Sequence, residues 1–426
     1  MNQAIETACI EILKKELVPA LGCTEPIALA YCGAKTRSVL GFDPDRVNVY
    51  ASGNVVKNVK AVTVPNSGNR KGIDTAVMLG MFGGDDTKEL EVLSTVTDKD
   101  IERALDFIKD GRFRCEIEEG AENLYIRTEA LKDDHKAAVE IIGDHTNITK
   151  IEKDGTVLYC RDPSETEEGP DYGVLDIRAI LDFAQETDLS AVKDVLQRQI
   201  DYNTAIASEG LKGEYGASVG RTLLDSYGNS VAVRARAMAA AGSDARMSGC
   251  GMPVVINSGS GNQGITVSMP VIEYAKQWNK SEEELLRALI ISNLVSIHIK
   301  HLIGSLSAFC GAVTAACGAG AAITWLAGND YETVCRTIVN TLANVSGIVC
   351  DGAKPSCAAK IASAVDAAIL GWNLSRDGKG FHGGEGLIKD SIEETIQSIA
   401  WVGRVGMKET DREILDIMLE RVNFND

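Results

Sequence analysis

The chain has 426 residues, of which 45% are hydrophobic and 5% aromatic, and 61 acidic residues against 43 basic ones give it a net charge of −18. This length can bury a large core and predicts two or three domains. The negative charge argues against nucleic acid or an anionic membrane as a partner, because both attract Lys and Arg patches, so a small molecule is the expected ligand. The 11 cysteines lack the spacing of a small secreted domain, which argues against a disulfide framework and favours a cytoplasmic location.

The N-terminus predicts two helices with a cysteine between them. Residues 1–22 are amphipathic and lack the charged-then-apolar order of an export signal. The next helix has Thr24 as its expected N-cap, Glu25 in the first turn and Pro26 just inside. Cys23 then lies directly before a helix N-terminus, whose partial positive charge favours a reactive thiolate. A small buried residue in a tight turn is the alternative for Cys23.

Two glycine-rich loops are candidate sites for a carboxylate. They are NSGNRKG at residues 66–72 and NSGSGNQG at residues 257–264. Backbone amides interspersed with small hydroxyl and amide side chains can receive a carboxylate or an amino-acid headgroup, whereas a plain turn is the alternative for both loops. Asn66, Ser258 and Asn262 are the candidate substrate ligands in these loops.

The middle of the chain changes from helical to β-like periodicity. Residues 90–97 (LEVLSTVT) alternate as a strand, residues 98–111 follow a helical pattern, and short alternating segments between 113 and 160 predict further strands. An acidic linker at residues 161–171 closes this unit. We expect its two histidines, His135 and His145, to be surface or structural residues.

The remainder of the chain is predicted to be almost entirely helical, because apolar residues recur at spacings of three and four. An uncharged run at 302–327 is long enough to span a bilayer, but its Gly, Ala, Ser, Thr and Cys content favours a buried core helix. The predicted fold class is α+β, with a mainly helical catalytic domain and a smaller β-rich insertion domain. The expected division is an N-terminal part of the catalytic domain at 1–86, the insertion at 87–171 and the helical part at 172–426.

Four cysteines form two C-x6-C pairs, Cys310 with Cys317 and Cys350 with Cys357. Thiolates among glycines and small residues suit an iron-sulfur cluster or another soft metal, while a zinc site and simple core packing are alternatives. Cys310 and Cys317 lie seven residues apart in a predicted helical stretch, so they would share one face. Three thiolates leave one iron of a cluster open as a Lewis acid, whereas a fourth would close the cluster and favour electron transfer.

Four motifs together resemble one family over essentially the whole chain. They are LGCTEPIALA, SGCGMPVVINSGSGNQGI, AFCGAVTAACGAGAA and GIVCDGAKPSCAAKIASAV. They are similar to the iron-sulfur L-cysteine desulfidase family, whose helical domain resembles the α-chain of bacterial iron-sulfur L-serine dehydratases. The resemblance implies a [4Fe-4S] cluster held by Cys310, Cys350 and Cys357, with Cys317 as a helical neighbour. It also implies that Cys23 is catalytic and that no pyridoxal phosphate (PLP) is used.

The implied reaction is β-elimination of L-cysteine to pyruvate, ammonia and sulfide. In it the Cys23 thiolate is the base, the site-differentiated cluster is the Lewis acid, and the two glycine-rich loops hold the substrate. An L-serine dehydratase with the same machinery is the close alternative, and a non-catalytic iron-sulfur redox or sensor protein is the more distant one. We expect an amino acid as the partner, with no nucleic acid and no membrane. A homodimer is a further possibility, because Ala and Gly helix faces can pack closely.

Overall fold

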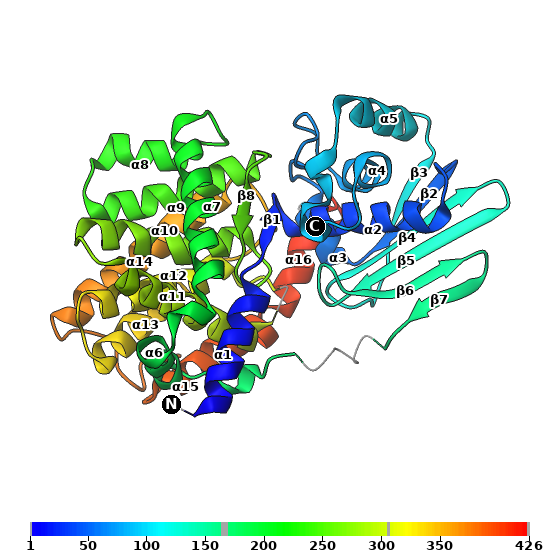
Figure 1. Cartoon of the computed structure of the whole chain (residues 1–426). Helices are drawn as coiled ribbons and strands as arrows, with labels where there is room; N and C mark the ends of the chain where they lie inside the picture. Colours follow the sequence, from blue (N-terminus) through cyan, green and yellow to red (C-terminus); the bar gives the residue numbers. More distant parts are fainter. Residues whose placement is uncertain (1, 163–168, 305–306, 424–426) are drawn as a thin grey trace.

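The computed structural model describes residues 2–162, 169–304 and 307–423, so residues 163–168 of the predicted linker lie outside the described part of the chain. A helical body and an α+β body lie side by side, and the chain passes between them more than once (Figure 1). This arrangement confirms the predicted mainly helical α+β fold.

The helical body packs helices from the N-terminus and from the second half of the chain. Its helices are α1 (Gln3–Glu16), α6 (Ile177–Glu186), α7 (Lys193–Lys212), α8 (Val219–Tyr227), α9 (Val231–Met247), α10 (Gly261–Gln277), α11 (Glu282–Ile303), α12 (Gly311–Leu326), α13 (Tyr331–Val345), α14 (Cys357–Arg376) and α15 (Ile392–Trp401). Short turns η2 (Tyr172–Val174), η3 (Leu189–Ala191) and η4 (Val402–Gly406) complete it. Local sequence explains several helix starts: Ser281 and Glu284, for example, form a capping box at the start of α11.

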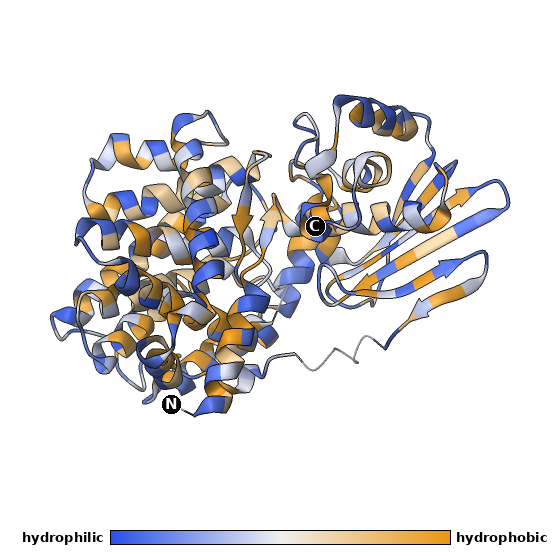
Figure 2. Cartoon of the chain, in the orientation of Figure 1, coloured by the Kyte–Doolittle hydropathy of each residue, from blue (hydrophilic) through white to orange (hydrophobic). Residues whose placement is uncertain are grey.

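Small residues allow the central helices of this body to approach closely. A Cβ atom on Gly318 of α12 would lie 2.1 Å from the carbonyl oxygen of Ser292 on α11, so no larger residue fits there. The uncharged run at 302–327, expected to form a buried core helix, forms one over most of its length as α12, most of whose residues are buried, while residues 305–306 of the run lie outside the described part of the chain. Among the described residues, α11 alone is long and apolar enough to cross a membrane, and 83% of its apolar window is buried in the protein. Hydrophobic residues, drawn in orange, alternate with hydrophilic ones along the helices of this body (Figure 2).

The α+β body is built on a six-stranded sheet with the order β3-β2-β4-β5-β6-β7. Its strands are β2 (Arg46–Ala51), β3 (Phe113–Ile117), β4 (Tyr125–Lys132), β5 (His135–Ile142), β6 (Ile148–Lys153) and β7 (Thr156–Cys160). Strand β2 pairs in parallel with β3 and antiparallel with β4, while the later pairs are antiparallel. Because β2 precedes residue 87, the sheet uses chain from both sides of the expected start of the insertion.

Helices on one side of the sheet complete the α+β body (Figure 1). They are α2 (Thr24–Leu40), α3 (Gly53–Val59), α4 (Ile73–Gly83) and α5 (Asp98–Lys109). The strand predicted at residues 90–97 is wrong, because this segment forms a 3-10 helix, η1 (Glu89–Thr95). Its buried residues Leu90, Val92 and Leu93 pack toward α2 and β1, and this tertiary burial outweighs the local alternation.

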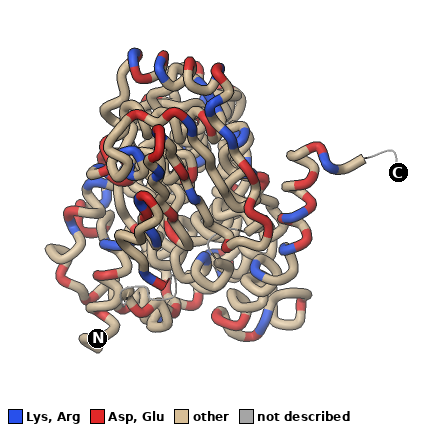
Figure 3. The backbone as a smooth tube through the Cα atoms, turned by 90° about the vertical axis from the view of Figure 1, so that its right-hand side faces the viewer, with Lys and Arg blue, Asp and Glu red and all other residues tan. Residues whose placement is uncertain are grey.

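Two connections hold the bodies together. Strand β1 (Pro19–Leu21) pairs antiparallel with β8 (Pro253–Val255), which places the turn before α2 beside the second glycine-rich loop. The C-terminal helix α16 (Lys408–Met418) packs on α3, where the buried Lys57 forms an ion pair with Asp411. In the view of Figure 3 this helix projects from the main mass of the protein and carries both acidic and basic residues.

Candidate active site

A cavity of about 460 Å³ lies where the two bodies meet. The helical body lines it with the glycine-rich loop before α10 and with the loops that carry three of the cysteines. The α+β body lines it with Lys57 and Asn58 of α3 and with residues 143–145, which follow β5. Clefts between domains are common ligand sites, and here each body supplies only part of the lining.

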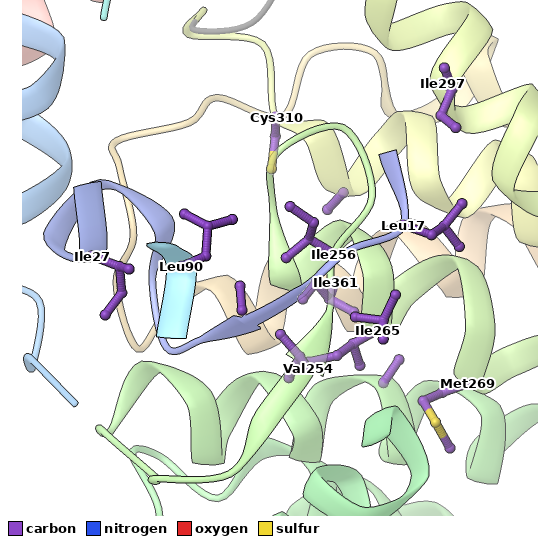
Figure 4. Close-up of a cluster of buried hydrophobic side chains, with 14 of the residues drawn as sticks. Leu17, Ile27, Leu90, Val254, Ile256, Ile265, Met269, Ile297, Cys310 and Ile361 are labelled. Carbon is purple, nitrogen blue, oxygen red and sulfur yellow. The ribbon is translucent and has the colours of Figure 1, made fainter. Parts of the chain in front are cut away.

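Cys310, Cys350 and Cys357 all line this cavity. Cys310 is the N-cap residue of α12, and Cys357 is the first residue of α14. Backbone hydrogen bonds join the two loops: the Cys310 N–H donates to the Ile348 oxygen at 3.0 Å, and the Cys350 N–H donates to the Ala308 oxygen at 2.6 Å. Cys310 also belongs to a cluster of buried apolar side chains (Figure 4). Loops separated in the sequence therefore bring the three thiols to one cavity.

Burial and the proximity of the thiols to one another both raise the pKa values of Cys310 and Cys357. Burial, and after it the neighbouring Cys350 and Cys357, together raise the pKa of Cys310 to about 12. Burial also raises the pKa of Cys357, although a hydrogen bond from the Lys354 backbone N–H lowers it. Burial lowers the pKa of Lys300 to about 8, and Cys350 and Cys310 oppose that shift. Burial therefore favours the neutral thiols, and a soft metal that binds thiolates would offset the cost of deprotonating Cys310 and Cys357 in this cavity.

Three thiols that line one cavity are a donor set that a soft metal or an iron-sulfur cluster can use. Across residues 2–162, 169–304 and 307–423, no three His, Cys, Asp or Glu side chains are placed to share one metal ion. In an iron-sulfur cluster each thiolate bonds to a different iron, so its ligands stand further apart than those of one zinc ion. The donor set, three thiols without a carboxylate or imidazole among them, is also the one that iron-sulfur clusters use.

Cys23 does not itself line the cavity, but it packs against residues of the cavity wall. It is the N-cap residue of α2, so the predicted cap at Thr24 is wrong by one position; the Thr24 hydroxyl instead lies 2.9 Å from the Gly259 carbonyl oxygen. Cys23 is 1% exposed and packs with Met247 and with Cys357 of the cavity wall. Burial raises its pKa to about 11, while Arg246 lowers it. Burial thus outweighs the effect of the helix N-terminus, which by itself would favour a thiolate.

Arg246 provides an anion-binding group on the helical side of the cavity. Its guanidinium lies across Gly261, the first residue of α10, where a Cβ atom would lie 2.3 Å from Arg246 Nε. Its Nε donates a hydrogen bond to the Gly22 carbonyl oxygen at 2.9 Å. The N-cap residue Ser260 makes no side-chain hydrogen bond to the helix start. A guanidinium beside uncapped helix amides is a strong receptor for a carboxylate.

The three predicted substrate ligands separate into two groups. Ser258 and Asn262 line the cavity, and the Asn262 side-chain oxygen is buried without a hydrogen-bond partner in the described structure. Asn66 does not line it, because its side-chain nitrogen donates to the Leu93 oxygen at 3.0 Å and its φ of 54° supports a turn. The first glycine-rich loop is therefore a turn, and only the second contributes to the cavity.

Several polar residues that line the cavity were not among the site residues predicted from the sequence. Lys57 and Lys300 are 2% and 6% exposed, and Glu25, Asn58 and Arg246 also line it. The available signal was chemical: Lys57, Lys300 and Arg246 each stand next to apolar or small residues in the sequence, where a buried charge is costly unless it has a partner or a function.

The structure also places Cys317 and His145 relative to the cavity. Cys317 is fully buried within α12 and does not line the cavity, and burial raises its pKa. His145, expected at the surface or in a structural role, lines the cavity, and its Nε2 atom is buried without a hydrogen-bond partner in the described structure. Cys310 therefore lines the cavity whereas Cys317 does not, and His145 of the α+β body adds a histidine to the lining.

Comparison with known families identifies the lineage of the chain. Residues 87–416 match the family described as serine dehydratase alpha chain. The chain belongs to this family. The matched segment of the serine dehydratase alpha-chain family includes Cys310, Cys350 and Cys357 and begins after Cys23. Membership supports a dehydratase-like lyase of amino-acid catabolism and confirms the resemblance to L-serine dehydratase α-chains.

Similar proteins from several bacteria align over nearly the whole chain. A UPF0597 protein of Lachnoclostridium phytofermentans is 54% identical over 411 residues, covering 96% of this chain and 99% of the relative. A UPF0597 protein of Desulfitobacterium hafniense is 48% identical, covering 97% and 96%, and one of Bacteroides thetaiotaomicron is 38% identical, covering 97% of each. These relatives span both bodies, so the two bodies occur together in proteins of this type.

Proposed function

We propose that this protein is a lyase that catalyses β-elimination from L-cysteine and releases pyruvate, ammonia and sulfide. One observation carries the proposal: in a member of the serine dehydratase alpha-chain family, three cysteines from two loops line one cavity beside a buried arginine. L-serine is the alternative substrate, because the family is described as serine dehydratase. Both reactions remove a β-substituent and an α-proton from the same type of amino acid.

Cys310, Cys350 and Cys357 would hold a [4Fe-4S] cluster. When bound, such a cluster with three protein ligands supplies a Lewis acid for the β-substituent that leaves. The proposal includes no pyridoxal phosphate. The backbone N–H of Lys354, which lies 3.4 Å from Cys357 Sγ, stabilises negative charge on that sulfur.

Arg246 and the start of α10 would bind the substrate carboxylate. A guanidinium offers paired N–H donors that match the two oxygens of a carboxylate, and the free amides of a helix start add to this attraction. Asn262, in the first turn of α10, would donate its second Nδ2 hydrogen to the same carboxylate, since the first points to Met247 Sδ. Two or more such contacts fix the orientation of the amino acid before its proton is removed.

Cys23 would accept the α-proton at its Sγ atom. Because burial raises its pKa to about 11, the Cys23 thiolate is a strong base, and the nearby Arg246 charge helps it to form. Cys23 packs against Ala353 and Cys357, both of which line the cavity, so the base lies next to the wall that would carry the cluster.

The proposal also covers location and partners. The protein would act in the cytoplasm on a free amino acid, without a nucleic acid or membrane partner, and a homodimer remains a prediction. A non-catalytic sensor with four cysteine ligands is the less favoured alternative, because Cys317 lies outside the cavity lining.

The deciding experiment is anaerobic purification followed by an absorption spectrum and assays for sulfide and pyruvate with L-cysteine or L-serine. Iron-sulfur absorption together with sulfide release from L-cysteine is the expected result. Pyruvate from L-serine alone would keep the elimination and change the substrate. A protein that holds its full cluster but converts neither amino acid would refute the proposal.

A further inference from the structure

Glu25 presents a carboxylate to the cavity and has no charged hydrogen-bond donor among the described residues. It lies in the first turn of α2, and its Oε1 atom accepts a hydrogen bond from Asn58 Nδ2 at 2.8 Å. Its Oε2 atom lies 3.2 Å from the Thr24 hydroxyl, whose single proton is shared with the closer Gly259 oxygen. A carboxylate accepts about four hydrogen bonds, so Glu25 has unused capacity toward the cavity.

Asn58 has a fixed orientation and an unsatisfied acceptor. Because its Nδ2 donates to Glu25, its Oδ1 must be the free end of the amide, and Oδ1 is buried with no hydrogen-bond partner in the described structure. The residue is only 6% exposed, so bulk water does not reach most of it. Buried side-chain acceptors normally have a donor, and one that lacks it inside a ligand cavity indicates a donor on the ligand.

We propose that Glu25 and Asn58 form the binding site for the ammonium group of an α-amino acid. A primary ammonium has three N–H donors, no acceptor and one positive charge, which complements one carboxylate and one amide oxygen. This inference rests on the proposed function and adds to it the group that recognises the amine.

The position of this pair relative to Arg246 supports the assignment. Arg246 is hydrogen-bonded to the Gly22 oxygen just before α2, and Glu25 lies three residues later in the first turn of that helix. Cys23 lies between them in the same turn. An amino acid with its carboxylate at Arg246 and its ammonium at Glu25 would have its α-carbon, which bears both groups, nearest to Cys23. The pair would thus select substrates that carry an amine and orient their α-proton.

The test compares a ligand that has the amine with one that lacks it. Glu25→Gln keeps the shape of the side chain and removes its charge, and full-length anaerobic protein is used throughout. We expect the KM for L-cysteine to rise at least about 10-fold, while the inhibition constant of 3-mercaptopropionate, which lacks the amine, changes by less than about 2-fold. Glu11→Gln, the same change at an exposed position on α1, should leave both values unchanged.

Calorimetric binding makes the test independent of turnover. The ligands are L-alanine and propionate, neither of which has a β-substituent to eliminate. The wild type should bind L-alanine more tightly than propionate, and Glu25→Gln should abolish this preference. Asn58→Ala, which removes only the amide, should reduce the preference for the ligand that carries the amine. It replaces Glu25→Gln in the test if that variant does not fold. An unchanged preference in a folded variant would overturn the ammonium site even if the enzyme is active. Lost preference in a protein that releases no product would support the site and refute the proposed reaction.

Discussion

The two bodies of this protein contribute different chemistry to one cavity. The helical body supplies the three thiols and Arg246 from helix starts and from the end of a helix, all held by close packing of small residues. The α+β body supplies the carboxylate and amide of Glu25 and Asn58, together with His145. Under the two proposals above, the helical side would hold the cluster and the substrate carboxylate, and the α+β side would recognise the amine. Neither body contains a complete site, so changes on the two sides should have separable effects.

The largest effect is expected on the helical side, from Cys357→Ala. Loss of one of three thiol ligands should release the cluster and lower turnover by more than about 100-fold. Iron and acid-labile sulfide content, measured beside the absorption spectrum, would show the loss. Cys160→Ala, an exposed cysteine on β7 of the other body, is the matched control and should keep both properties. A fully loaded and active Cys357→Ala protein would contradict the ligand assignment.

Cys23→Ala tests the residue at the boundary between the bodies. Removal of a general base should reduce turnover by about 10²- to 10⁴-fold, yet the iron content and spectrum should match the wild type. Parallel measurements of iron content and kcat separate the two roles. Loss of the cluster in this variant would instead make Cys23 a ligand, in which case the proton acceptor must be sought elsewhere.

Asp411→Asn tests the connection that holds the α+β side in place. It leaves Lys57, which is 2% exposed, beside a neutral amide, whereas Asp411 itself is 17% exposed. We expect the free energy of unfolding to fall by about 1–3 kcal/mol, because a buried charge loses its partner. Denaturant titration gives this value. Glu413→Gln, an exposed position on the same helix, should change it little, and equal stability of all three proteins would show that α16 is not held by this ion pair.

The smallest functional effect is expected from Cys317→Ala. Cys317 is fully buried in α12 and lies outside the cavity lining, so cluster content and turnover should stay at wild-type values. Loss of the buried sulfur should cost about 1 kcal/mol of stability through the small cavity it leaves. Iron analysis and thermal unfolding measure the two properties. A cluster that disappears with Cys317 would favour the four-ligand sensor instead.

Local patterns were sufficient for most secondary structure. Periodicity predicted most helices of the second half, the helix at residues 98–111 and the strands between residues 113 and 160, and these are confirmed. It did not predict α10, whose first turn takes up residues 261–264 of the expected glycine-rich loop. It failed at residues 90–97, where a 3-10 helix buries its apolar residues against α2 and β1. It also misplaced the N-cap of α2, because the Thr24 hydroxyl bonds to the distant Gly259 oxygen. Each of the last two errors lies where a long-range contact competes with a local preference.

The residues of the cavity likewise fall into two groups: those that the sequence predicted and those whose position depends on contacts between distant parts of the chain. The sequence alone determined the candidate thiols, the second glycine-rich loop and the resemblance to a family. Only the tertiary structure decided that Cys310 faces the cavity while Cys317 does not, since Cys310 is an extended N-cap residue rather than part of the helical face. It likewise decided that Asn66 supports a turn and that Glu25 meets Asn58, 33 residues away. Periodicity reports which residues share a face of one element, whereas burial and hydrogen-bond pairing depend on contacts between elements far apart in the chain.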